Sequence, residues 1–195
     1  MKRFGVGYIV VFLLVYCFPL HSEDITLDVS KVAEKAVPIV SADIIEPKRL
    51  LIPALKVLSP IVGMGQTPEG RMAVPDNYTE VGWYNLGTRP GAIGSAVMGA
   101  HVDNGSTLHG VFKNLKKLKI GDDIYVLDQF NNALHYRVTE KTIYPYRSKD
   151  TEKVFSRNDA RRLNLITCYG TWLPKENTYD RRLVIFAELV KKQKL

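Results

Sequence analysis

Most of the chain from Arg49 onward consists of short apolar runs separated by glycine, proline and polar turn residues. Short runs of strand-forming residues bounded by such turns predict β-strands. The predicted strands include residues 49–53, 55–58, 95–102, 124–127, 134–144, 163–168 and 183–189. About eight short strands with closely spaced turns are typical of an all-β sandwich or a closed barrel. We favour the barrel, because its rim can gather residues that are far apart in the sequence.

Little helix is expected. Gly110 opens a short helical turn in which Leu115 and Leu118 are spaced to bury one face. The opposite face carries three lysines, Lys113, Lys116 and Lys117. We interpret this lysine cluster as a solvated surface. Three further connections are predicted, a polar helical segment at 147–162 and loops at 63–77 and 169–180.

An uncharged apolar segment from Phe4 to Leu20 follows Lys2 and Arg3. Its length matches the apolar region of a secretory signal peptide or the short end of a membrane-spanning helix. The positions before His21 lack the small residues of a cleavage site, and the basic pair favours a cytoplasmic N-terminus. We therefore predict an uncleaved anchor, with the rest of the chain on the outer side of the cell membrane.

Three parts follow from this pattern. Residues 1–20 are the predicted membrane anchor, residues 21–47 an extracytoplasmic stalk, and residues 48–195 a single folded domain. The stalk mixes acidic residues with small and apolar ones, and its helical periodicity is weak. The expected location is the cell membrane, crossed once, with the folded domain outside the cytoplasm.

Composition fits this division. Of the 195 residues, 46% are hydrophobic and 24% are charged, which is enough for one domain with a substantial core. The formal net charge is +7, which fits an ordinary basic surface or residence near anionic lipid or anionic wall polymer. No motif indicates nucleic acid as a partner.

Cys168 is the only cysteine outside the apolar N-terminal segment. The other, Cys17, follows Tyr16, where lipid attachment requires a small residue, so we interpret it as an inert membrane thiol. An exported Cys168 has no partner for an intrachain disulfide, and a lone thiol in an oxidising compartment is a liability unless it has a purpose. Its place at the end of an apolar strand indicates a nucleophile at the rim of a sheet, with a buried structural cysteine as the alternative.

Two other predicted strands carry suitable partners for this thiol. One leads to His101, and the last strand opens on Arg181 and Arg182. A thiolate can attack a peptide carbonyl, an imidazolium can protonate the departing amine, and a guanidinium can stabilise the oxyanion. Because consecutive strand residues face opposite sides, only one of the two arginines can point at Cys168, and we assign Arg182. His109, in the adjoining loop, competes with His101 as acid and base.

Three segments resemble the signatures of the sortases, cysteine transpeptidases of the cell envelope. Leu165-Ile166-Thr167-Cys168 is similar to the aliphatic-x-Thr-Cys sequence that ends the seventh sortase strand. Gly99-Ala100-His101-Val102-Asp103 resembles the segment of the catalytic histidine, with Ala100 where many members have glycine. Arg182-Leu183-Val184-Ile185-Phe186-Ala187 resembles the eighth strand, where an arginine precedes an aliphatic run and alanine. Shorter matches are Ile52-Pro53, Gly82-Trp83-Tyr84, Pro90-Gly91, Val111-Phe112-Lys113-Asn114-Leu115 and Gly121-Asp122.

The resemblance runs from about Arg49 to Leu189 and implies an eight-stranded sortase β-barrel with one or two short helices. It assigns four residues to the site: Cys168 as nucleophile, His101 as general acid and base, Arg182 as stabiliser of oxyanion and substrate, and Thr167 as a residue that lines the substrate groove.

The resemblance also implies the reaction and its partners. Such an enzyme cleaves a Leu-Pro-x-Thr-Gly-like sorting signal of a surface protein after threonine, holds the acyl group as a thioester, and passes it to an amine of the cell wall or of a pilin. The short loops and the Trp83-Tyr84 segment are most similar to classes D, E and F, with class F first. No cofactor is expected, and no metal, since no calcium-binding cluster of acids stands out in residues 147–162.

Three other functions compete with this assignment. A hydrolytic cysteine peptidase could use the same residues with water as the acceptor. In an L,D-transpeptidase of peptidoglycan the cysteine follows a Ser-x-Gly-like segment, whereas Cys168 follows Ile166-Thr167. A barrel that only binds envelope peptides is the third possibility, and the joint presence of cysteine, histidine and arginine argues against it.

Overall fold

The computed structural model describes residues 37–38, 44–103, 107–149 and 151–190. The predicted anchor, residues 1–20, lies outside these ranges, as does most of the predicted stalk. Within them, no helix combines the length and the apolar composition that crossing a membrane requires.

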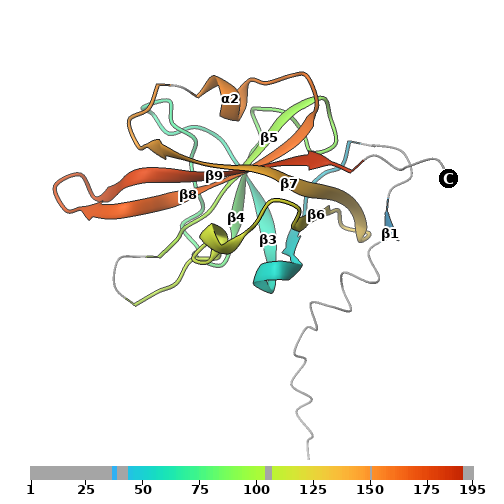
Figure 1. Cartoon of the computed structure of the whole chain (residues 1–195), viewed down its shortest axis with the longest axis horizontal. Helices are drawn as coiled ribbons and strands as arrows, with labels where there is room; N and C mark the ends of the chain where they lie inside the picture. The colour runs from blue at the N-terminus through green and yellow to red at the C-terminus, as the bar shows by residue number, and fades with distance from the viewer. Residues whose placement is uncertain (1–36, 39–43, 104–106, 150, 191–195) are drawn as a thin grey trace, which may run out of the picture.

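Eight β-strands close into a barrel (Figure 1). The strands are β2 (Arg49–Ile52), β3 (Val57–Met64), β4 (Val81–Tyr84), β5 (Gly94–Gly99), β6 (Asp123–Leu127), β7 (Asn132–Pro145), β8 (Arg161–Leu173) and β9 (Thr178–Leu189). Their order is β7-β6-β2-β3-β4-β5-β8-β9, and pairing of β7 with β9 closes the barrel. A short strand, β1 (Val37–Pro38), pairs in parallel with β7. The predicted eight-stranded all-β barrel is therefore confirmed.

The described helices are short connections between strands. They are η1 (Pro53–Leu55), η2 (Leu115–Lys117) and α2 (Glu152–Phe155). In the segment predicted to be helical at 147–162, the described residues form only the single turn α2, and β8 already begins at Arg161. The run Ser156-Arg157-Asn158-Asp159 follows this turn, and Ser, Asn and Asp favour caps and turns over helix interiors.

Alternating residues of β8 and β9 fill the interior of the barrel. Leu163 and Leu165 of β8 are fully buried, and they lie in one core cluster with Leu183 and Ile185 of β9. Trp83 of β4 belongs to the same cluster. Full burial of one such side chain contributes about 1.5–3 kcal/mol to the stability of the fold.

The residues between them face the outside of the barrel and are covered by the connection from β7 to β8, which arches over the sheet in Figure 1. Val184 and Phe186 of β9 pack there with Val154 of α2. The buried amide of Asn164 donates a hydrogen bond from Nδ2 to the Val154 carbonyl oxygen, 2.6 Å away. Cys168 shares this outward face of β8, because it is an even number of residues from Asn164.

The strand that leads to His101 is shorter than predicted. β5 ends at Gly99, whereas a strand over residues 95–102 was expected. Beyond it, the backbone pairs with the following turn instead of the sheet, because the His101 carbonyl accepts from the Phe112 N–H and the Val102 carbonyl from the Gly110 N–H. Gly110 permits this approach, since a Cβ there would lie 2.1 Å from the His101 carbonyl oxygen.

The cysteine strand is longer than predicted. β8 continues past Cys168 to Leu173 and forms a hairpin with β9, so the loop expected at 169–180 is wrong. The two strands shift register between Tyr169 and Trp172, where Gly170 takes a φ of +94°. A bulge at this glycine allows the strand to bend and continue.

Residues just before β2 also contact the barrel. Ile45 is buried in the main core and donates its N–H to the Pro90 carbonyl. Glu46 forms an ion pair with Arg89 at 2.7 Å. Lys48, where we predicted that the folded domain begins, donates its N–H to the Leu127 carbonyl at the end of β6.

Candidate active site

Parallel pairing of β5 with β8 brings the backbone at His101 to the sheet edge at which Cys168 lies. The register aligns Gly99 with Ile166, and the Ala100 N–H still donates to the Ile166 carbonyl at 3.2 Å. Parallel strands end at the same edge of a sheet, so the residues that follow Gly99 come beside Cys168. The Thr167 hydroxyl reinforces this junction by donating to the Ala100 carbonyl at 2.8 Å.

Antiparallel pairing of β8 with β9 places an arginine opposite the thiol. Cys168 is aligned with Arg182, and Tyr169 with Arg181. Paired residues of antiparallel strands point to the same side of the sheet. Arg182 therefore lies on the same face of the sheet as Cys168, and Arg181 lies on the opposite face. Arg181 instead meets Asp180 in an ion pair of 3.6 Å.

The Cys168 thiol experiences opposing influences. Burial is the largest of them and raises the thiol pKa, and the negative charge of Asp103 also raises it. The positive charge of Arg182 and a hydrogen bond from the Tyr179 backbone lower the pKa. The net effect is a raised pKa, so the thiol is mainly protonated at neutral pH and needs a base before it can act as a nucleophile.

The His101 ring is held by two neighbours. Its Nε2 lies 2.9 Å from the Pro75 carbonyl oxygen, and its plane stacks on Tyr78 with a centroid separation of 4.3 Å. A carbonyl oxygen only accepts, so Nε2 carries a hydrogen and Nδ1 remains for proton exchange. His109, the competing histidine, is exposed on the segment that bridges to Asp103.

The Arg182 guanidinium is bound to the end of the β8–β9 hairpin. Nη1 donates to the carbonyls of Tyr179 and Arg181, both at 2.9 Å, and Nη2 donates to the Thr178 hydroxyl at 2.8 Å. The guanidinium carbon also lies 5.8 Å from the centroid of the Tyr146 ring, within the range of a cation–π contact. These contacts fix a permanent positive charge beside the cysteine.

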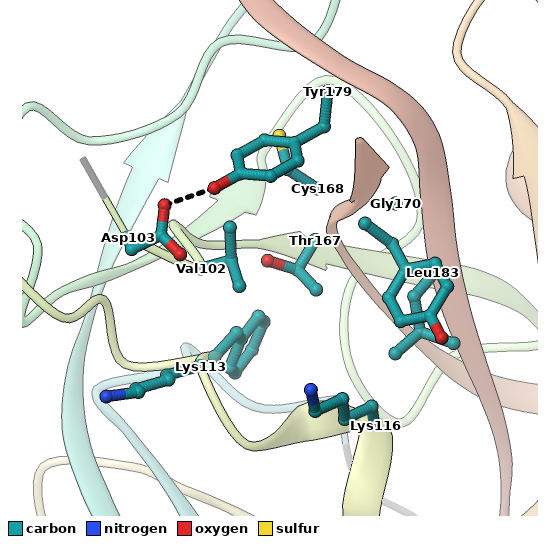
Figure 2. A pocket seen from close by; sticks show the side chains of 11 residues that line it. Val102, Asp103, Lys113, Lys116, Thr167, Cys168, Gly170, Tyr179 and Leu183 are labelled. Atoms are coloured by element: carbon teal, nitrogen blue, oxygen red, sulfur yellow. Dashed lines mark hydrogen bonds between the residues drawn. The ribbon is translucent and has the colours of Figure 1, made fainter. Parts of the chain in front are cut away.

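A pocket of about 400 Å³ opens beside Cys168 (Figure 2). It borders the barrel core at Phe112 and Leu183 and reaches Thr167 on β8. At its rim the Tyr179 hydroxyl donates to an Asp103 carboxylate oxygen at 2.6 Å, the dashed line of Figure 2. This hydrogen bond is the largest cause that raises the Tyr179 pKa to about 12, so the phenol stays protonated.

The residues described so far can perform acyl transfer. They offer a thiol nucleophile, a histidine on the adjacent strand end and a fixed guanidinium. A family model described as the sortase domain matches residues 50–190, from β2 through β9.

The chain belongs to the sortase family.

Solved structures of other sortases share this fold. Sortase A from Corynebacterium diphtheriae, as a lid mutant, has a TM-score of 0.58 and 20% identity, covering 82% of this chain and 75% of that one. Sortase C-1 from Actinomyces oris has a TM-score of 0.56 and 24% identity, covering 75% of this chain and 74% of that one. The Clostridium perfringens sortase D5 transpeptidase has a TM-score of 0.55 and 20% identity, covering 83% of this chain and 86% of that one. A search of curated proteins returned no matching sequence.

These solved structures belong to classes A, C and D, so assignment of this sortase to class F stays a prediction. The catalytic roles of Cys168, His101 and Arg182 and the substrate-binding role of Thr167 also stay predictions.

Sequence reasoning missed several residues of this site. Asp103 lies two positions after His101, inside a segment that was recognised, but nothing in its spacing showed that it faces the thiol. Tyr179 was expected in a loop, and its bond to Asp103 depends on the extended hairpin. Lys113 and Lys116, interpreted as a solvated face, line the pocket beside Cys168.

Proposed function

We propose that this sortase is a membrane-anchored cysteine transpeptidase that cleaves a Leu-Pro-x-Thr-Gly-like sorting signal after threonine and joins the threonine to an amine of the cell wall or of a pilin. The observation that carries the proposal is the alignment of Cys168 with Arg182, next to the strand end that leads to His101. Membership of the sortase family supports the same reaction class.

Acylation is the first half of the proposed reaction. Cys168 gives its proton to His101, and the thiolate attacks the threonine carbonyl carbon. The carbon–sulfur bond forms while the carbonyl electrons move to oxygen, and Arg182 stabilises the oxyanion. His101 then protonates the glycine nitrogen as the carbon–nitrogen bond breaks, which leaves a thioester on Cys168.

Transfer to the acceptor is the second half. The acceptor amine attacks the thioester carbonyl, and its proton passes to His101. The carbon–sulfur bond breaks, and Cys168 leaves as a thiolate that recovers its proton from His101. Thr167, through its bond to Ala100, holds β8 against the end of β5 during both halves and borders the substrate.

The test is ligation of defined peptides. The purified chain is mixed with a panel of threonine–glycine signal peptides and candidate amines, and products are identified by mass. We expect a thioester on Cys168 and a threonine–amine ligation product, and loss of both in Cys168→Ala with an unchanged circular dichroism spectrum. Ligation by Cys168→Ala at a near-normal rate would remove this cysteine from the mechanism. Hydrolysis without any amine-dependent product would identify a cysteine peptidase instead.

The membrane location is tested by fractionation. The full-length protein is expected in the membrane fraction and should resist extraction by high salt, because ions screen a basic patch but not an apolar segment. A soluble product that begins near His21 or later would show cleavage of the N-terminal segment.

A further inference from the structure

Two glycines lie opposite each other on the sheet beside the candidate active site. Gly82 of β4, the first residue of the segment Gly82-Trp83-Tyr84, pairs with Gly99 of β5, so one face of the sheet carries no side chain at this pair. Gly99 is also aligned with Ile166 of β8, two residues before Cys168. Because side chains alternate along a strand, this bare patch lies on the face of the sheet that carries the thiol.

The β3–β4 loop, residues 65–80, lies on this patch. A Cβ at Gly82 would lie 2.9 Å from Cδ of Pro75 and 2.7 Å from Cγ of Met64. Across the pair, a Cβ at Gly99 would lie 3.4 Å from Cε of Met72. Carbon atoms that are not bonded to each other pack at about 3.5–4.0 Å, so Pro75 can occupy its place only because Gly82 has no side chain.

Pro75 presents its backbone carbonyl to His101. The imidazole Nε2 lies 2.9 Å from this oxygen, and the ring stacks on Tyr78 at a centroid separation of 4.3 Å with 22° between the planes. The hydrogen bond fixes the direction in which Nε2 points, and the stacking fixes the plane of the ring. Since the carbonyl can only accept, Nε2 keeps its hydrogen and Nδ1 is the nitrogen that can take up a proton.

Tyr78 is held in place by backbone bonds to two other parts of the barrel. Its carbonyl accepts from the Val111 N–H at 2.9 Å, and the carbonyl of Thr79 accepts from the buried Ser59 hydroxyl of β3 at 2.7 Å. The Asn77 side chain stabilises the same turn by accepting from the Thr79 N–H at 3.0 Å. None of these bonds uses the phenol hydroxyl of Tyr78, so the path of the backbone places the ring.

We propose that the β3–β4 loop positions His101 for proton transfer. Gly82 admits Pro75 to the surface of the sheet, the Pro75 carbonyl keeps the hydrogen on Nε2, and the Tyr78 ring supports the plane of the imidazole. The inference rests on the proposed transpeptidase function, in which His101 takes up the Cys168 proton and later protonates the glycine nitrogen. Gly82, Pro75 and Tyr78 act through His101, so they are positioning residues.

The first readout is the His101 ring itself. Full-length protein that carries isotope-labelled histidine is studied by NMR, and the signal that disappears in His101→Gln identifies the ring. We expect the Nε2–H proton to exchange with water about tenfold faster in Gly82→Ala than in the wild type, the size of one lost hydrogen bond, because the added methyl group displaces Pro75. Gly65→Ala is the matched control, since a Cβ at Gly65 meets nothing within 4 Å.

The second readout is the rate of thioester formation in single-turnover kinetics. A misplaced reacting group costs up to about a hundredfold in rate, so Gly82→Ala and Tyr78→Leu should slow acylation by about ten- to a hundredfold. Tyr78→Phe keeps the ring and should recover most of the rate, and Gly65→Ala should match the wild type. Circular dichroism confirms that each variant is folded, and should Gly82→Ala fail to fold, the two Tyr78 variants decide alone.

Equal acylation rates in Tyr78→Leu and Tyr78→Phe, or an Nε2–H that exchanges as slowly in Gly82→Ala as in the wild type, would overturn the positioning role and leave the transpeptidase function standing. Normal thioester formation by His101→Gln would remove this histidine from the proposed mechanism, and the positioning role with it. Absence of any thioester in the wild type would overturn the transpeptidase function itself.

Discussion

The thiol of Cys168 depends on two neighbouring charges of opposite sign. Arg182 comes from the adjacent strand and favours the thiolate, whereas Asp103 comes from the segment after β5 and favours the thiol. Since burial already raises the thiol pKa, the balance of these two charges decides how readily the nucleophile forms.

Replacing Asp103 with asparagine should lower the Cys168 pKa. The substitution removes a negative charge that opposes thiolate formation while keeping nearly the same shape. The rate of alkylation by iodoacetamide, measured against pH, should therefore rise at a lower pH than in the wild type. Glu69→Gln removes an equal charge that pairs with Arg71 at 3.5 Å, and its profile should not move. A shift to higher pH in Asp103→Asn would mean that Asp103 acts through structure instead of charge.

The two adjacent arginines should differ sharply in importance. Arg182 shares the face of Cys168, whereas Arg181 pairs with Asp180 on the other side. Loss of an oxyanion donor typically costs about a hundred- to a thousandfold in rate, and one lysine ammonium cannot reproduce the planar fork of a guanidinium. We expect Arg182→Lys to slow acylation by this amount and Arg181→Lys to be nearly silent in single-turnover kinetics. Equal losses would show that both arginines contribute or that the substitutions distort β9.

At the scale of elements, β8 has two tasks. Its inward residues build the core, and its outward residues carry both the thiol and the anchor for α2. Asn164 makes the only side-chain hydrogen bond to α2 that we find among the described residues of β8, and its Oδ1 has no partner there. The connection that covers the outward face is held by this bond, by the ion pair of Lys153 with Glu140 of β7 at 2.5 Å, by the bonds of Arg162 to Asp159, and by the packing of Val154.

Asn164→Ala should loosen this connection. The change leaves the Val154 carbonyl without its donor, and an unsatisfied buried group costs about 1–3 kcal/mol. We expect a fall of this size in the free energy of unfolding and faster amide hydrogen exchange in residues 151–156. Asn158→Ala, an exposed asparagine of the same connection, is the control and should change neither quantity. Unaltered exchange in Asn164→Ala would mean that the packing of Val154 and the Lys153–Glu140 ion pair hold α2 without this hydrogen bond.

At the scale of the whole molecule, closure of the barrel brings distant segments into buried contact. Tyr136 of β7 is fully buried, and its hydroxyl accepts a hydrogen bond from the Gly91 N–H at 2.9 Å. Burial raises the Tyr136 pKa above its ordinary value of 10.0. Because the folded state favours the protonated phenol, this contribution to stability is complete below the unfolded pKa and is lost as the pH rises toward the folded one.

Tyr136→Phe should therefore be less stable at neutral pH but less sensitive to alkali. Loss of the acceptor leaves the buried Gly91 N–H unsatisfied, which costs about 1–3 kcal/mol. Above pH about 10 the free energy of unfolding should fall more steeply for the wild type than for the variant. The difference in stability between the two proteins should therefore become smaller as the pH rises. Urea unfolding at pH 7 and at several values above pH 10 measures both effects. Parallel pH profiles would show that the phenol does not titrate during unfolding.

The sequence by itself determined the barrel and the chemistry that it can carry. Alternating apolar positions and turn residues encode strands locally, and the segments around His101, Cys168 and Arg182 were sufficient to suggest a sortase. The alternation of side chains showed that only one of Arg181 and Arg182 can face Cys168, and the resemblance of residues 182–187 to the eighth sortase strand favoured Arg182, which the structure aligns with Cys168.

Only the tertiary structure decided which residues surround the thiol. β5 ends before His101 because the backbone carbonyls of His101 and Val102 accept hydrogen bonds from the following turn. β8 continues past Cys168 because a bulge at Gly170 lets the strand bend without ending. The bond between Tyr179 and Asp103 and the turn of Lys116 toward the pocket join segments more than fifty residues apart. Such contacts follow from how the closed barrel brings strand ends together, and no local pattern of polar and apolar residues records them.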